Sequence, residues 1–234
     1  MASLADSMAY VMLMSSLPRP LSLFGATQTP ISRLKLDRRL RILDEEDAKD
    51  LRLIEDALDW GHLPIDLTTD QVIQRVRVAM ADTENPVLRQ IIRDRLEMRT
   101  VMAALRARHR GDGPPKGAWG YGRWTQQIAR NWTEPNFRLE GVFPWIAEAQ
   151  HLLALPDPMA LERLLMQQSW TQLGRLAGAH EFDFEAVVIY VLRWNIVDRW
   201  VRYDGKAAAE RFEQLVETAL QDVEENIMPE MAHG

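Results

Sequence analysis

The pattern of apolar and polar positions predicts helices along most of the chain, and it is densest between residues 182 and 205. The sixteen residues 186–201 hold eleven large apolar side chains, spaced three and four apart on two neighbouring faces. Asp183 is a suitable N-cap for such a helix, and Gly205 is a suitable end. A membrane span needs about 20 mostly apolar residues, whereas charged and amide side chains interrupt this run. The segment therefore predicts a helix of about five turns that other helices bury on several sides.

Seven other segments show helical periodicity. Asn85, followed by a proline, gives the clearest start, for a helix of roughly 24 residues that ends before Gly111. Asp157, also followed by a proline, starts a second helix that ends before Gly178. Residues 14–30 contain three prolines and are expected to be extended or irregular. The remaining helices are predicted at residues 44–60, capped by Asp44, and at 68–80, 124–132, 144–153 and 212–227.

Glycines and prolines interrupt this helical pattern at residues 111–122, and the chain shows hardly any strand signal. The predicted fold is all-α, a multi-helix bundle. Its organisation is predicted as an N-terminal helical part (1–110), a Gly/Pro-rich loop or linker (111–122) and a C-terminal helical part (123–234). These parts form either two lobes joined by the loop or one continuous domain.

Composition and charge narrow the classes of protein. The 234 residues are 47% hydrophobic and 26% charged, which is typical of a globular chain. Without cysteine there is no disulfide framework, thiolate metal site or thiol nucleophile, and the reducing cytoplasm is the expected compartment. The N-terminus lacks the basic front of a signal peptide. A net charge of −6 argues against a general nucleic-acid binder or a binder of anionic membranes.

Two features suggest a surface for a protein partner. Residues 32–41 contain the strongest basic cluster, which is either a solvated helix face neutralised by the acidic stretch after it or a docking site for an acidic partner. The chain also has eight tryptophans, which either pack between helices or anchor a partner. The candidate partner-binding residues are Arg33, Lys35, Arg38, Arg39 and Arg41 in the cluster and Trp119, the tryptophan expected to be exposed in the Gly-rich loop.

The usual signatures of catalysis are missing from the sequence. It contains no phosphate loop, dinucleotide fingerprint, HExxH motif or serine elbow. The five histidines are at least 29 residues apart, so no local pair of metal ligands exists. The carboxylates of residues 43–50 could bind a cation. At a predicted helix start, however, acidic side chains are better explained by their favourable interaction with the helix dipole. We therefore predict no catalytic residue, no cofactor and no metal.

A polar site on the buried helix is the remaining enzymatic alternative. Tyr190, Arg193 and Asp198 could form it. The same spacing also allows these polar side chains to form hydrogen bonds or ion pairs with neighbours on the same helix, as buried polar groups usually do. Asp198, for example, lies within about one turn of both Asn195 and Arg202. The second interpretation is the one we favour.

Three segments resemble a known family. They are YVMLMSSLP at residues 10–18, FDFEAVVIYVLRWNIVDRW at 182–200 and AAERFEQLVE at 208–217. In order and spacing they resemble the short bacterial C-subunit-like proteins associated with V-type ATPases, collinearly over nearly the whole chain. The motifs are structural, so no catalytic residue is carried over.

The resemblance implies an all-helical, non-catalytic subunit seated between the central shaft and the membrane rotor ring. Its partners would be the central-shaft subunits and the rotor ring, without nucleic acid and without a membrane span of its own. It would be cytoplasmic and peripheral to the inner membrane through those protein partners. A helical scaffold or regulator of another complex is the alternative, and a soluble helical enzyme is a further one.

Overall fold

The computed structural model describes residues 4–19, 22–58, 76 and 83–205. All regular structure in these residues is helical, so the predicted all-α fold is confirmed. The helices are α1 (Leu4–Ser16), α2 (Arg33–Leu40), α3 (Glu45–Leu58), α5 (Pro86–His109), α6 (Thr125–Arg130), α7 (Ile146–Leu153), α8 (Pro158–Ala177) and an unlabelled helix at 184–205. The predicted helix at 212–227 lies outside the described residues. Of the predicted helix at 68–80, only Val76 is described, and it is helical and buried.

Side-chain caps start the helices where the sequence predicts them. The Asn85 carboxamide oxygen accepts hydrogen bonds from the first turn of α5, at 3.0 and 3.2 Å. Asp157 caps α8 in the same way, at 2.9 and 3.2 Å. Asp44 accepts from an amide of α3 at 2.8 Å, and Asp183 accepts from the Ala186 amide at 2.8 Å. Each cap satisfies amides that have no partner within the helix, which fixes the start of each element.

The N-terminal region differs in part from the prediction. Residues 14–16 belong to α1, so the expected irregular segment 14–30 begins later, and it contains a short 3₁₀ helix at Leu23–Gly25. Helix α1 is held by Leu13, which is buried in the main core together with Leu17, the residue that follows the helix. Packing of this apolar face therefore outweighs the proline signals that follow it.

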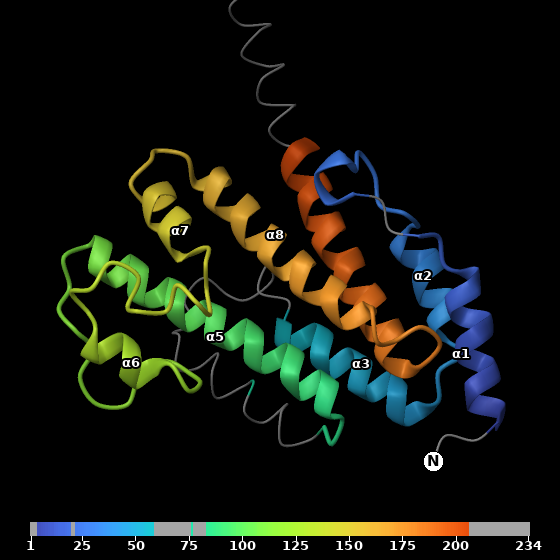
Figure 1. Ribbon diagram of the computed structural model, residues 1–234. Helices are drawn as coiled ribbons and strands as arrows, with labels where there is room; N and C mark the ends of the chain where they lie inside the picture. The colour runs from blue at the N-terminus through green and yellow to red at the C-terminus, as the bar shows by residue number, and fades with distance from the viewer. Residues whose placement is uncertain (1–3, 20–21, 59–75, 77–82, 206–234) are drawn as a thin grey trace, which may run out of the picture.

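The core consists of two hydrophobic clusters. The first joins the helix at 184–205 to α1, α2, α3, the N-terminal half of α5 and the C-terminal half of α8. The second joins the C-terminal half of α5 to α6, α7 and the start of α8. Figure 1 shows the helix at 184–205 between α8 and the N-terminal elements α1 and α2. Because α5 and α8 contribute to both clusters, the cores do not follow the division at 111–122, and that division stays a prediction.

The helix at 184–205 is buried on several sides, as its apolar circumference predicts. Side chains from Phe184 to Trp200 are largely buried, including Trp194 at 5% exposure. The Trp194 indole nitrogen donates to the Ile31 carbonyl oxygen at 2.7 Å. Within the described part of the chain, none of the helices combines the length and apolar character needed to cross a membrane.

The Gly/Pro-rich segment forms no helix, and its second half is attached to α5. The Tyr121 amide donates to the Thr100 hydroxyl at 2.8 Å. Just beyond the segment, the Trp124 indole donates to buried Glu97 at 2.9 Å. Gly122 has a φ of 92°, and a Cβ there would lie 2.5 Å from the Glu97 side chain. Glycine is therefore required where the loop passes over α5.

Candidate functional site

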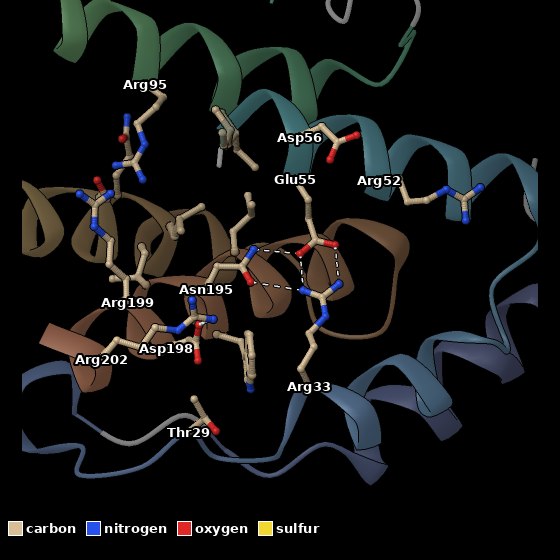
Figure 2. Close-up of a pocket in the computed structure, with 18 of the residues that line it drawn as sticks. Thr29, Arg33, Arg52, Glu55, Asp56, Arg95, Asn195, Asp198, Arg199 and Arg202 are labelled. Carbon is tan, nitrogen blue, oxygen red and sulfur yellow. Dashed lines mark hydrogen bonds and ion pairs between the residues drawn. The ribbon is translucent and has the colours of Figure 1, made fainter. Parts of the chain in front are cut away.

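A cavity of about 860 Å³ lies where α2, α3, α5, α8 and the helix at 184–205 meet. Figure 2 shows charged side chains from these elements projecting into it. The apolar wall includes Ile91, Leu173, Leu192, Trp194 and Ile196. The charged lining residues are Arg33, Arg52, Arg95, Arg199, Arg202, Glu55, Asp56 and Asp198.

One end of the cavity is a closed ion-pair network. The Arg33 guanidinium makes two bonds to the Glu55 carboxylate, at 2.7 and 3.1 Å, and Asn195 donates to the same carboxylate at 2.9 Å. The guanidinium also pairs with Asp37 at 2.8 Å and lies 5.7 Å from the Trp194 ring centroid. The hydrogen bond to Glu55 raises the pKa of Arg33 against the desolvation that lowers it. This network joins α2, α3 and the helix at 184–205, so its role is structural.

The other end brings two arginines together. Arg95 from α5 and Arg199 from the helix at 184–205 point toward one another in Figure 2. Arg199 pairs with Glu162 of α8 at 2.9 Å. Burial lowers the pKa of Arg95 to about 10, with Arg199 acting in the same direction and Glu162 opposing both. Arg95 is thus a desolvated cation that is still protonated at pH 7.

The predicted basic cluster divides into inward and outward residues. Arg33 lines the cavity, and Arg39 donates to the Ser16 carbonyl oxygen, so both hold α2 in the fold. Lys35, Arg38 and Arg41 are exposed, and within the described residues their side chains make no ion pair or hydrogen bond. Glu55 and Asp37, rather than the acidic stretch at 44–50, neutralise Arg33. Within the basic cluster, these three outward residues are the candidates for contact with a partner.

Trp119 is not the exposed tryptophan that we expected. It is half-buried and packs against the second cluster. The reason is that the loop is hydrogen-bonded to α5 immediately after Trp119, at Tyr121. Packing against the second cluster therefore accounts for Trp119.

The structure does not bring Tyr190, Arg193 and Asp198 into one polar site. The Tyr190 hydroxyl donates to the Pro18 carbonyl oxygen at 3.0 Å, and burial raises its pKa to about 12, so it remains a donor at pH 7. The Arg193 guanidinium lies 3.8 Å from the centroid of the Trp170 ring. Asp198 pairs with Arg202 at 2.5 Å, which confirms the predicted intrahelical pair.

A group of potential metal ligands lies at the start of the helix at 184–205. One ligand atom each from His180, Asp183 and Glu185 lie within 4.8 Å of one another. His180 is 2.7 Å from Asp183, and Glu185 accepts from the Asn85 carboxamide at 2.9 Å. The bond between Asn85 and Glu185 joins the start of α5 to the start of the helix at 184–205, so Glu185 already has a structural role. A search for paired histidines alone could not find it.

Arg95 was missed by the sequence analysis, although its position carries a signal. It lies four residues after Ile91 and three after Ile92, so it occupies the apolar stripe of α5. An arginine on such a stripe indicates a cation held between helices. Nothing local indicates Arg199 or Glu162 as its neighbours, because they come from other helices.

Comparison with known proteins gives a family without a function. A family model described as "Protein of unknown function (DUF2764)" matches residues 70–223. No curated protein and no solved structure matches the chain. The matched range includes α5, the whole loop that follows it, and the helix at 184–205.

Proposed function

Because the chain belongs to the DUF2764 family, whose description assigns no activity, we propose its function from its own residues. It is a non-catalytic coupling subunit of a V-type rotary ATPase, and it links the central shaft to the membrane rotor ring. The link is made by protein contacts, so the chain is peripheral to the inner membrane on its cytoplasmic side.

One observation carries this proposal: two segments that resemble the C-subunit-like proteins of V-type ATPases pack on each other. The Tyr190 hydroxyl bonds to the Pro18 carbonyl oxygen across 172 residues of sequence. Leu13 and Leu17 lie in the same buried cluster as Val187 and the apolar residues that follow it. The resemblance therefore falls on residues that build the core together. A shared fold would produce a likeness at such positions, whereas a chance likeness would have no reason to fall on residues that touch.

The mechanical character of the fold also supports a coupling role. Helix α5 has 24 residues, so it is about 36 Å long, and it contributes to both hydrophobic clusters. A protein that transmits torque needs a stiff body with surfaces for two partners. Helices shared between two packed cores resist bending at the junction, because any bend disturbs both cores.

Deletion of the gene tests the proposal. Hydrolysis in the soluble head and ion movement in the membrane are coupled only while the connecting parts stay attached. Membranes without this protein should therefore retain ATP hydrolysis in the head, lose ATP-driven ion uptake, and release the head more easily on washing. The measurement is ion uptake per ATP hydrolysed, with the restored wild-type gene as the control.

Partial restoration should raise coupling in proportion to the amount of the protein bound. Wild-type uptake per ATP in the deletion membranes would contradict the stalk role. Co-purification with other proteins instead of ATPase subunits would then favour a scaffold of another complex.

The outward basic residues of α2 and its C-cap, Arg41, provide a second prediction. Reversal of Arg38 and Arg41 to glutamate should slow assembly with ATPase complexes from the deletion strain by roughly tenfold at low ionic strength, because opposite charges steer association. The effect should shrink as salt screens the charges. Association rates across a salt series measure it.

The matched control reverses Arg130 and Arg175, which are also exposed but lie on α6 and α8. Circular dichroism should show the same fold in both double variants. If the α2 variant assembles at the rate of the control at low salt, the cluster is an ordinary solvated face.

A further inference from the structure

His180, Asp183 and Glu185 bring a ring nitrogen and two carboxylates together at the start of the helix at 184–205. We propose that these three side chains bind one Zn²⁺ ion, with water completing its coordination. This inference goes beyond the coupling role and does not depend on it, because the ligands all lie in one short segment of this chain. It replaces the expectation of no metal, which rested on the wide spacing of the histidines.

The ligand atoms already lie close to the distances that an ion requires. One from each residue is within 4.8 Å of the other two, and His180 Nδ1 is 2.7 Å from Asp183 Oδ2. Zinc bonds of about 2.0–2.2 Å place two ligands about 3.3 Å apart across a tetrahedral ion. The His180–Asp183 pair must therefore open by about 0.6 Å, and no pair must close by more than about 1.5 Å. Rotations about side-chain bonds are sufficient for such changes.

The hydrogen bond between His180 and Asp183 marks the place of the ion. The imidazole nitrogen and the carboxylate oxygen now share a hydrogen, and a zinc ion between them takes its place. The ring proton then lies on Nε2, so the imidazole stays neutral and no proton is lost. Glu185 supplies the third bond from the first turn of the helix.

Neighbouring amides orient both carboxylates. Asp183 Oδ1 accepts from the Ala186 amide at 2.8 Å, and Glu185 Oε1 accepts from the Asn85 carboxamide at 2.9 Å. Each carboxylate thus has one oxygen engaged with an amide and a second oxygen to offer to an ion. Hydrogen bonds of this kind hold the ligands of metal sites in position. Because Asn85 caps α5, an ion here would also strengthen the contact between two helix starts.

The charge of the group suits a divalent cation. Asp183 and Glu185 contribute one negative charge each, so together they balance Zn²⁺. The start of a helix is the positive end of its dipole, which by itself disfavours a cation. Here the Ala186 amide is already bound to Asp183, so the ion faces carboxylates rather than bare amides.

The imidazole of His180 determines the kind of metal. Imidazole is a good ligand for zinc, whereas Mg²⁺ and Ca²⁺ prefer oxygen ligands and take six or more of them. Three protein ligands with one water match the four-coordinate geometry of zinc. The side chains of His180 and Asp183 are 19% and 42% exposed, which leaves a path for the ion and its water.

Isothermal titration calorimetry of the full chain, first treated with a chelator and dialysed, tests the proposal with three metal ions. Zn²⁺ should bind saturably with micromolar affinity, while Mg²⁺ and Ca²⁺ should bind far more weakly. Absence of saturable zinc binding would overturn the proposal. Binding of Mg²⁺ as tightly as Zn²⁺ would also overturn it, because the imidazole would then have no part in recognition.

Substitution of each ligand locates the ion. H180A, D183N and E185Q should each weaken zinc binding at least about tenfold. Asparagine caps a helix as well as aspartate does, and glutamine keeps an oxygen that can accept from Asn85. D183N and E185Q therefore preserve the local fold, and they decide the matter if circular dichroism shows that H180A is unfolded.

Two matched controls remove similar groups elsewhere. H151A removes an exposed histidine of α7, and E181Q removes an exposed carboxylate beside the group. Both variants should bind zinc like the wild type. Unchanged affinity in folded D183N and E185Q, or a loss in H151A equal to that in H180A, would place the zinc elsewhere and contradict the site.

Thermal unfolding provides a readout that is independent of the heat of binding. An ion that binds only the native state should raise the melting temperature by roughly 5 °C when free zinc is about 100 times its Kd. E185Q at the same zinc concentration should show a much smaller rise. An equal rise in E185Q would show that zinc acts through other residues and would contradict the proposal.

Discussion

Replacing Trp194 with alanine is expected to lower the free energy of unfolding by about 3–5 kcal/mol. The indole is 5% exposed in the first cluster, so its removal loses apolar burial and leaves a cavity. It also leaves the Ile31 carbonyl oxygen without the hydrogen bond that joins it to Trp194 at 2.7 Å. The Arg33 guanidinium, 5.7 Å from the ring centroid, loses its aromatic neighbour. Urea denaturation followed by circular dichroism measures the loss.

Phe182→Ala is the matched control for this variant. Phe182 precedes the same helix and is 44% exposed, so its removal should change stability by no more than about 0.5 kcal/mol. A Trp194→Ala protein with the wild-type denaturation midpoint would show that the first cluster is not packed around this side chain.

Replacing Phe137 with alanine should have an effect of similar size, about 3–5 kcal/mol, through the second cluster. The side chain is fully buried, with its ring centroid 5.6 Å from that of Trp132. The Arg108 guanidinium lies 4.2 Å from the Phe137 centroid and donates to nearby carbonyl oxygens of residues 132, 134 and 135. Loss of the ring therefore removes both packing and the support of that arginine.

Unfolding of this variant also tests how the two clusters are related. We expect one cooperative transition by circular dichroism and by tryptophan fluorescence, because α5 and α8 contribute to both clusters. Val142→Ala, at a 44% exposed position of the same region, is the control. Two separate transitions in Phe137→Ala would favour the division into two lobes.

Local signals in the sequence were enough to predict most helices. Asn85 and Asp157 each precede a proline, and such a pair specifies a helix start without help from the rest of the fold. Helix α1 was missed because its stability depends on Leu13 meeting residues from the other end of the chain. No pattern within residues 4–16 reports that contact.

The candidate site was predicted less well than the fold, and the basic cluster shows why. Arg33 and Arg38 have the same chemistry and lie in the same helix, but only Arg33 turns toward Glu55. The direction depends on where α2 is packed, which the sequence of α2 does not contain. The cavity requires residues from five elements, so its existence could be established only from their arrangement in space.

The long sequence separations in the first cluster impose an order on folding during synthesis. Trp194 bonds to a residue 163 positions earlier, and Tyr190 to one 172 positions earlier. The second cluster, by contrast, is built within the described residues from positions 98–165. A chain emerging from the ribosome can thus complete the second cluster while the apolar sides of α1, α2 and α3 still lack their central helix. Those surfaces stay open until residues 184–205 have been released, and this interval is when the nascent protein most needs protection from aggregation.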